Sequence, residues 1–298
     1  MKIEVIDRLT QKREEEIVYG RRAIEFLYGS SFLGPIFRFF ATHLPFVSAF
    51  YGWLQKRPAS RKKIAPFVQM FNIDLDEYEN DFASFNDFFI RKLKPGVRPI
   101  DSADAICPAD GRYRFFPDIA RADGFVVKGE KFCLATLLES EALAARYHHG
   151  SMVIARLAPP DYHRFHFAVE GFVKTPRVIN GWLYSVNPAA LVRDIAIFTK
   201  NKRVLTEVET PLFGLVVCLE IGATAVGSIH QTFKANETVL RGDEKGYFEF
   251  GASALILLFE KGKIEFDPDL LQLQQQGFEI KCRMGQSLGS HENRQSHT

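Results

Sequence analysis

From Asp101 onward, the sequence is a succession of short apolar runs separated by glycines. The clearest runs are 152–158, 215–221, 254–259 and 263–266, and glycines at 222, 227, 242, 246 and 251 punctuate them. Runs of this length are typical of buried strands, and glycines supply the turns between them. This part of the chain therefore predicts a β-rich core built from many short strands.

The residues before Asp101, and one later stretch, favour helices. In "SFNDFFIRKL", Ser84 is followed three residues later by Asp87, a pairing typical of a helix N-terminus. The stretch 134–147, "LATLLESEALAARY", is also predicted to be helical, whereas "KPGVRPI" at 94–100 is predicted to be a loop. The chain of 298 residues is therefore expected to be an α+β protein, with N-terminal helices followed by a β-rich core.

An aromatic and basic segment lies near the N-terminus. Ten of the 28 residues from 26 to 53 are Phe, Tyr or Trp, but Pro35, Arg38 and Pro45 interrupt the apolar run that a transmembrane helix needs. We therefore expect short amphipathic helices that lie in a lipid interface, with basic side chains toward the headgroups. These basic residues are Arg21, Arg22, Arg38, Lys56, Arg57, Arg61, Lys62 and Lys63. A helical cap packed on the body of the protein and a true membrane span are the alternatives.

Composition and charge narrow the class of protein further. Residues 1–63 carry 12 Lys or Arg against 6 Asp or Glu, which suits an anionic surface. We expect 1–63 to form a membrane-associating helical region and 64–298 to form the catalytic domain. The net charge of +2 for the whole chain argues against a dedicated nucleic-acid binder. The four cysteines include no C-x-x-C pair, and no secretory signal follows Met1, so a reducing compartment is expected.

Two histidines and one aspartate stand out from the β-rich background. Asp110 lies in "CPADGRYRFF", where an Asp-Gly pair is most often a hairpin turn. His163 and His166 lie in "APPDYHRFHF"; they share a face if the segment is helical and point to opposite faces if it is extended. With Asp161 or Glu170 as a third ligand they could hold a metal, although no H-E-x-x-H frame is present. The remaining candidates, His148, His149 and His230, have a weaker context.

Ser253 opens the apolar run in "FEFGASALILLF", two residues after Gly251. Position 255 is Leu, so the second glycine of a nucleophile elbow is missing and an α/β-hydrolase is not predicted. Asp110, His166 and Ser253 nevertheless supply the members of a Ser-His-Asp set, which is defined by geometry and not by order in the chain. A small residue at the start of a close-packed strand is the alternative interpretation of Ser253.

Several separated motifs together resemble one family. They are "SFNDFFIRKLKPGVRP", "CPADGRY", "APPDYHRFHF", "INGWLYSVNP", "NKRV", "CLEIGATAVGSI", "KGYFEFGAS" and "CRMGQSLG". Over roughly 80–288 the chain resembles the bacterial, pyruvoyl-dependent phosphatidylserine decarboxylases. That resemblance implies a self-processing decarboxylase, which converts phosphatidylserine to phosphatidylethanolamine and CO2 at a membrane surface.

The resemblance also implies roles for particular residues. The proenzyme would be cut between Ala252 and Ser253, giving a β chain of 1–252 and an α chain of 253–298. Ser253 would become the covalent pyruvoyl group and the Schiff-base centre for the substrate amine. His166, oriented by Asp110, would remove the proton from Ser253 during cleavage. His163 would donate a proton during decarboxylation, and no metal would be needed.

The implied partners are phosphatidylserine, an anionic membrane surface, the β and α chains of one precursor and a homodimer, with no nucleic acid. The implied location is peripheral, on the cytoplasmic face of the cell membrane. The chain departs from the family pattern at Ala252, where Gly is usual, and at Ala254, where Ser or Thr is usual. The alternatives are an unprocessed relative, a metal-dependent hydrolase using His163 and His166, and a non-catalytic membrane-binding module.

Overall fold

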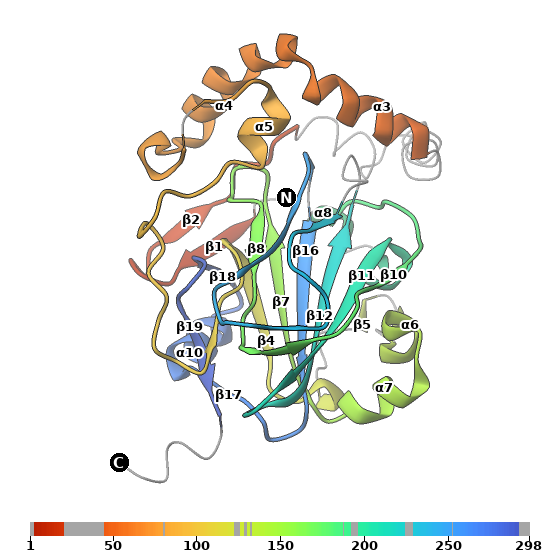
Figure 1. The fold of residues 1–298 in the computed structure, drawn as a ribbon. Helices are drawn as coiled ribbons and strands as arrows, with labels where there is room; N and C mark the ends of the chain where they lie inside the picture. Colours follow the sequence, from red (N-terminus) through yellow and green to blue (C-terminus); the bar gives the residue numbers. More distant parts are fainter. Residues whose placement is uncertain are drawn as a thin grey trace.

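The computed structural model describes residues 3–20, 45–79, 81–121, 126–127, 130–131, 133–186, 188–191, 196–223, 229–251 and 253–291. In these residues a large sheet forms the body of the protein, and helices gather at its edges and at one end (Figure 1). The α+β prediction is confirmed. After two short strands, β1 and β2, the next elements along the described chain are helices, and most of the strands follow them.

Eleven strands of the described residues form one sheet, in the order β14-β9-β11-β12-β16-β7-β4-β18-β1-β2, with β10 paired to β11. Their bounds are β1 (Glu4–Asp7), β2 (Arg13–Glu15), β4 (Gly111–Phe116), β7 (Ser151–Leu157), β9 (Gly171–Val173), β10 (Arg177–Ile179), β11 (Arg203–Thr210), β12 (Gly214–Gly222), β14 (Glu237–Val239), β16 (Ser253–Phe259) and β18 (Glu279–Cys282). Neighbouring strands are antiparallel except β1 and β18, which are parallel. The two ends of the described chain therefore meet in one sheet.

The central strands β12, β16 and β7 are covered on both faces. Along β16, Leu255 and Leu257 pack into one hydrophobic cluster, while Ile256 and Leu258 pack into another on the opposite face. A strand covered on both faces is apolar at most positions. This explains why these strands were predictable as largely apolar runs, in which Arg156 of β7 and Glu220 of β12 are buried charged exceptions. The run 263–266 is the weakest of the set, since it forms only the two-residue strand β17 (Glu265–Phe266).

Three smaller sheets complete the β structure. A sheet of β13 (Ile229–Gln231), β15 (Glu244–Phe248) and β8 (Arg164–His166) packs on the main core through Phe165 and Phe248. A second sheet joins β17 to β19 (Ser287–Ser290) and β3 (Ala105–Ile106), and β5 (Val126–Val127) pairs with β6 (Glu130–Lys131). The first of these sheets includes His166, at the end of β8.

The helices form a layer over one end of the sheet and cover its flanks (Figure 1). Their bounds are α3 (Pro45–Lys56), α4 (Ile64–Phe71), α5 (Phe85–Phe89), α6 (Leu134–Leu138), α7 (Glu141–Tyr147), α8 (Pro188–Leu191), α9 (Ile197–Lys200) and α10 (Pro268–Gln275), with 3-10 turns at Pro58–Lys63, Leu75–Glu77 and Ile119–Arg121. Phe67 of α4 and three phenylalanines of α5 form an aromatic cluster with Phe250. This cluster ties the helical layer to the segment that precedes Ser253.

The helix start predicted at Ser84 is confirmed, because its Oγ accepts a hydrogen bond of 3.1 Å from the Asp87 N–H. The helical prediction for 134–147 is confirmed, although a break at Glu139 and Ser140 divides the stretch into two short helices, α6 and α7. Glu139 ends α6 in the left-handed region at φ 45°, and Ser140 then caps α7 by accepting from the Leu143 N–H at 3.2 Å. A left-handed residue followed by a capping serine breaks the helix.

The predicted interfacial segment is described only in part, because 21–44 lies outside the described residues. Within the part of the chain that the structure describes, no helix combines the length and the apolar character needed to cross a bilayer. The described helix α3 has two different sides. Tyr51 packs against Phe250 with ring centroids 5.8 Å apart, while Phe50 and Trp53 are 60% and 49% exposed.

Candidate active site

Ser253 is the first residue of β16 and lies between two strands. It is paired with Gly222 of β12 and with Leu157 of β7, and its exposed fraction is 0%. Its Oγ is buried and has no hydrogen-bond partner among the residues that the structure describes. A buried hydroxyl without a partner costs about 1–3 kcal/mol, so its presence in a native structure calls for an explanation. The other residue of the predicted cleavage site, Ala252, lies outside the described residues.

Gly251 explains the small-residue bend before Ser253. Its φ is 146°, a backbone conformation that is open to glycine and strained for residues with a side chain. Ala254 lies on the opposite face of β16 from Ser253, within an apolar cluster. A hydroxyl at position 254 would therefore point away from the Ser253 side of the strand.

His163 is the histidine nearest to this bend. Its Nδ1 donates to the Asp161 carbonyl at 2.9 Å, so in the neutral ring Nε2 carries no proton. Nε2 is buried and has no hydrogen-bond partner among the described residues. Its ring lies against Phe89, with centroids 3.9 Å apart. Burial lowers the pKa of His163 to about 3, although the nearby Gly251 backbone raises that pKa in part. The ring is therefore neutral at pH 7 and has an open acceptor beside the bend.

His166 is the last residue of β8, whereas His163 directly precedes this strand. Its Nδ1 donates to the Gly242 carbonyl at 2.8 Å, so its Nε2 accepts from the Tyr162 hydroxyl at 3.1 Å. Burial lowers the pKa of His166, and this ring is also neutral at pH 7. The two rings therefore have different partners, the Asp161 carbonyl for His163 and the Gly242 carbonyl for His166.

Asp110 is close to His166 without contacting it. The backbone N–H of His166 donates to the Pro108 carbonyl at 2.8 Å. The negative charge of Asp110 is close enough to raise the pKa of the His166 ring, which offsets part of the lowering by burial. The Asp110 carboxylate accepts instead from Arg98 Nη2 and from the Met284 N–H, both at 2.8 Å. In this intact chain, then, Asp110 and His166 share one neighbourhood, His163 and Ser253 share another, and no hydrogen bond joins the predicted triad.

The metal-site alternative gains no support from the described residues, in which no three His, Cys, Asp or Glu side chains gather as a metal site would require. Asp161, considered as a ligand, is instead paired with Arg112 and accepts from the Ala158 N–H at 2.6 Å. The weaker candidates lie apart. His149 is exposed near Asp118, and His230 stacks on Tyr247 with centroids 4.8 Å apart.

Two functional neighbours were not predicted from the sequence. Arg98, in a segment predicted only as a loop, is the ion-pair partner of both Asp110 and Glu77. Tyr162 holds Nε2 of His166 and lines, with Asp110 and Arg98, a surface groove of about 280 Å³. The sequence signals were weak: Arg98 lies in a proline-containing loop, and Tyr162 lies between Asp161 and His163. Neither pattern indicates which residue the side chain will contact.

Comparison with known proteins places this site in a family. Residues 85–290 match the family model described as phosphatidylserine decarboxylase. The chain is 47% identical to a "Phosphatidylserine decarboxylase proenzyme" of Chlamydia caviae, over 97% of this chain and 98% of the relative. Proteins of the same name from Chlamydia pneumoniae and Chlamydia muridarum are 46% and 49% identical, over at least 95% of both chains.

These matches first define a class, because every one of the relatives above is named as a decarboxylase made as a proenzyme. The chain belongs to the phosphatidylserine decarboxylase family, as its motifs predicted. Family membership supports decarboxylation of phosphatidylserine as its chemistry. Residues 1–84 lie outside the match to the family model, although the full-length relatives extend over them.

Proposed function

We propose that this chain is a proenzyme that cuts itself between Ala252 and Ser253 and then decarboxylates phosphatidylserine with the pyruvoyl group derived from Ser253. One observation carries the proposal: two buried polar atoms without hydrogen-bond partners, Ser253 Oγ and His163 Nε2, flank the same bend at Gly251. A buried nucleophile with no competing partner suits an internal attack, and the neutral imidazole of His163 beside it is available for the proton transfer that follows in decarboxylation.

The cleavage needs only groups of the chain itself and one water molecule. The Ser253 oxygen attacks the Ala252 carbonyl carbon, the C–N bond breaks, and an ester replaces the amide. Removal of the Ser253 Cα proton then expels the Ala252 carboxylate and leaves dehydroalanine. Hydrolysis of dehydroalanine releases ammonia and leaves the pyruvoyl end. This group supplies a ketone that accepts the electron pair released when CO2 leaves the substrate.

The family resemblance assigns the base in cleavage to His166, oriented by Asp110, and the proton donor in decarboxylation to His163. Two contacts bear on these roles. Nε2 of His166 must be released by the Tyr162 hydroxyl before it can act, and neutral His163 must take up a proton before it can give one. A bound anionic headgroup would favour that protonation, since a nearby negative charge raises the pKa of an imidazole.

The two chains would stay together after the cut. β16 would belong to the α chain, and it pairs along its length with β12 and β7 of the β chain. β18 would also belong to the α chain, and it pairs with β4 and β1. The α chain would therefore contribute two interior strands to the main sheet and remain bound without a covalent link.

Intact mass measured under denaturing conditions tests the proposed function. We expect two polypeptides, the smaller of which spans 253–298 and weighs about 5 kDa at roughly 110 Da per residue. The smaller chain should be lighter by one NH3 than the product of simple hydrolysis, and it should react with a carbonyl reagent. A single full-length polypeptide without a carbonyl-reactive end would overturn the proposal.

We also propose that the enzyme works at a membrane surface, as a peripheral protein of the cytoplasmic face, with α3 as part of the docking region. The exposed side of α3 carries Phe50 stacked on Trp53 at 5.7 Å, and the Arg57 guanidinium lies 4.6 Å from the Trp53 ring. The other side of α3 is tied to the bend, because Lys56 forms an ion pair of 2.7 Å with Glu249. A lipid docked on α3 would therefore lie on a helix that contacts the segment preceding Ser253.

Replacing Phe50 and Trp53 by serine together should weaken binding to vesicles that contain anionic phospholipid by at least about tenfold. Burying one such side chain stabilises by about 1.5–3 kcal/mol, and 1.4 kcal/mol corresponds to a factor of ten. Flotation of the two proteins with vesicles measures the difference. The matched control is Leu240→Ser, since Leu240 is 63% exposed elsewhere on the surface. Equal flotation of wild type and the double variant would contradict the docking role of α3.

A further inference from the structure

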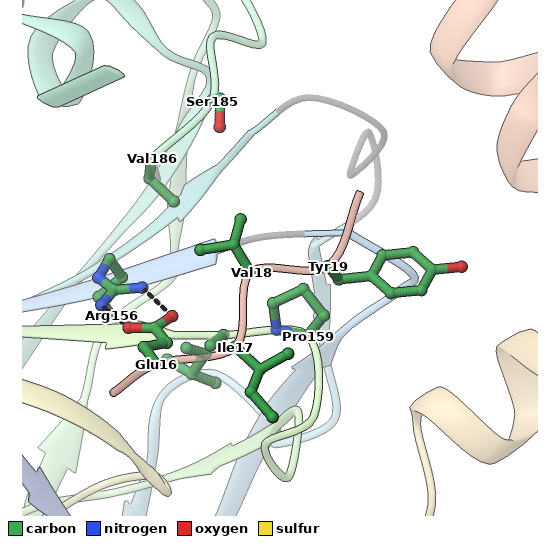
Figure 2. A pocket seen from close by; sticks show the side chains of 10 residues that line it. Glu16, Ile17, Val18, Tyr19, Arg156, Pro159, Ser185 and Val186 are labelled. Carbon is green, nitrogen blue, oxygen red and sulfur yellow. Dashed lines mark hydrogen bonds and ion pairs between the residues drawn. The ribbon is translucent and has the colours of Figure 1, made fainter. Parts of the chain in front are cut away.

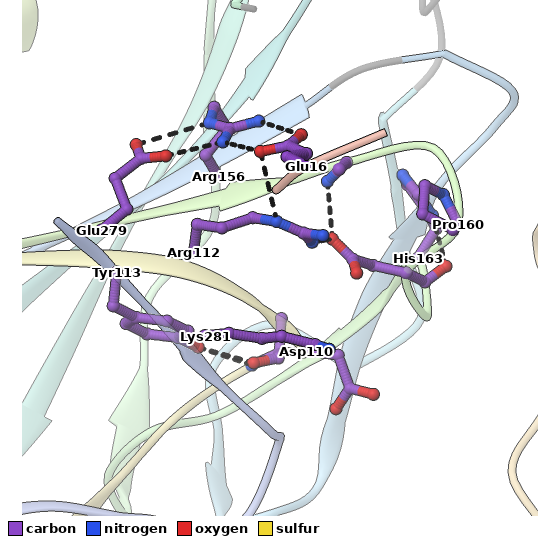
Figure 3. A network of polar contacts seen from close by, with 12 residues as sticks. Glu16, Asp110, Arg112, Tyr113, Arg156, Pro160, His163, Glu279 and Lys281 are labelled. Atoms are coloured by element: carbon purple, nitrogen blue, oxygen red, sulfur yellow. Dashed lines mark hydrogen bonds and ion pairs between the residues drawn. The ribbon is translucent and has the colours of Figure 1, made fainter. Parts of the chain in front are cut away.

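Two buried arginines lie side by side on the main sheet. Arg112 of β4 is directly opposite Arg156 of β7, and their side chains are only 7% and 4% exposed (Figure 3). Like charges directly opposite each other repel, and burial removes the water that would screen them. The pair therefore requires negative charges close by.

The N-terminal segment supplies one of these charges. Both carboxylate oxygens of Glu16 accept from Arg156, at 3.0 and 2.6 Å, and Glu16 Oε2 lies 3.6 Å from Arg112 Nε. The Glu16 side chain is 4% exposed. Burial raises its pKa, but the two arginines more than offset this and hold that pKa below the usual range. Glu279 completes the set by accepting from the far side of Arg156 at 2.6 Å.

The network reaches the histidine motif through Arg112. The other end of the Arg112 guanidinium contacts the Asp161 carboxylate, which also accepts from the Ala158 N–H. The Asp161 backbone carbonyl in turn accepts from His163 Nδ1. A continuous path of charged contacts and hydrogen bonds therefore runs from Glu16 to the imidazole beside Gly251 (Figure 3).

The segment that carries Glu16 also reaches the helical layer. Figure 2 shows Glu16 beside Arg156 at one end of this segment and Tyr19 at the other, with Pro159 alongside. The residues between them line a cavity of about 50 Å³ above the end of β7. The Tyr19 ring lies 5.2 Å from that of Phe67 and 6.4 Å from that of Phe250. The segment is thus anchored on both sides of the site.

We propose that Glu16 is a positioning residue for this site: its carboxylate holds Arg112 against Asp161, and thereby fixes the turn that aims His163. Glu16 touches no reacting atom and acts only through the two residues between. It lies outside 85–290, so the match to the family model does not include it. This inference rests on the proposed function and adds the N-terminal segment to its machinery.

Glu16→Gln in the full chain removes the charge and keeps the shape. We expect the rate of self-cleavage, and kcat of the processed enzyme for phosphatidylserine, to fall by about 10- to 100-fold, since a small displacement of a catalytic group has effects of this size. KM should change by less than about threefold, because Glu16 is not placed against substrate. Glu16→Asp keeps the charge and should recover part of the rate. The matched control is Glu4→Gln, an exposed carboxylate on the adjacent strand β1, which should behave as wild type.

The outcomes separate this inference from the proposed function. A wild-type chain that is never cut overturns the proposed function and the inference together. A wild-type chain that is cut, beside Glu16→Gln with unchanged rates, overturns the inference alone. A Glu16→Gln protein that melts at a lower temperature but keeps a normal kcat also overturns it, since Glu16 would then only stabilise the fold. If Glu16→Gln does not accumulate as folded protein, Glu16→Asp decides: a lower kcat at unchanged stability supports positioning, and an unchanged kcat refutes it.

Discussion

A Ser253→Ala chain will remain one full-length polypeptide and will not decarboxylate phosphatidylserine. The substitution removes the oxygen that would attack the Ala252 carbonyl and, with it, the source of the pyruvoyl group. The fold should be preserved, because Ser253 Oγ has no hydrogen-bond partner that would be left unsatisfied. We expect the free energy of unfolding to change by no more than about 1 kcal/mol, so the loss will be chemical and not structural.

Intact mass and a denaturing gel measure this result, and Ser151→Ala is the matched control. Ser151 is also buried, is the first residue of the adjacent strand β7, and donates a hydrogen bond of 2.8 Å to the Pro117 carbonyl. Its loss should cost about 1 kcal/mol of stability and leave cleavage intact. If Ser253→Ala is still cut at the same bond, Ser253 is not the nucleophile and the proposed chemistry fails.

The strands nearest Ser253 could be predicted from the sequence because a strand that is buried on both faces appears as a largely apolar run. The run 254–259 is apolar at each position, and β16 extends over it with one extra residue, Ser253. The bend before it was also predictable, since Gly251 adopts a φ that favours glycine. Both features are determined by residues that are adjacent in the chain, so they can be predicted from the local sequence.

The partners of the site residues could not be predicted, because they come from distant parts of the chain. Asp110 is bound by the Met284 N–H, 174 residues away, and Arg156 by Glu16, 140 residues away. A charged residue in a sequence gives no sign of which opposite charge it will meet. The same limit applies to the split of 134–147 into two helices, where a left-handed Glu139 overrides strong helical composition.

The histidine motif shows where residue spacing is ambiguous and structure is needed. A spacing of three places His163 and His166 together on a helix and apart on a strand. In the structure only His166 belongs to strand β8, and the two rings have different neighbours: the bend at Gly251 for His163, and Tyr162 with Gly242 for His166. The spacing alone could not have shown that the two rings have different neighbours.

Replacing the two histidines one at a time should separate cleavage from turnover. We expect His166→Ala to remain uncut, because it lacks the proposed base for Ser253. We expect His163→Ala to be cut but to have a kcat about 10²- to 10⁴-fold lower, the usual effect of losing a general acid. Intact mass measures the first property and CO2 release from phosphatidylserine the second. His149→Ala, which alters an exposed histidine, should change neither.

The reverse pattern would reassign the base. The Nε2 of His163 is already open beside Gly251, whereas that of His166 accepts from Tyr162 in the intact chain. If His163→Ala stays uncut while His166→Ala is processed, His163 is the group that activates Ser253, and Asp110 has no part in cleavage through His166. A Tyr162→Phe variant then adds an independent test. Freeing Nε2 of His166 should speed cleavage if His166 is the base, and should leave its rate unchanged if His163 is.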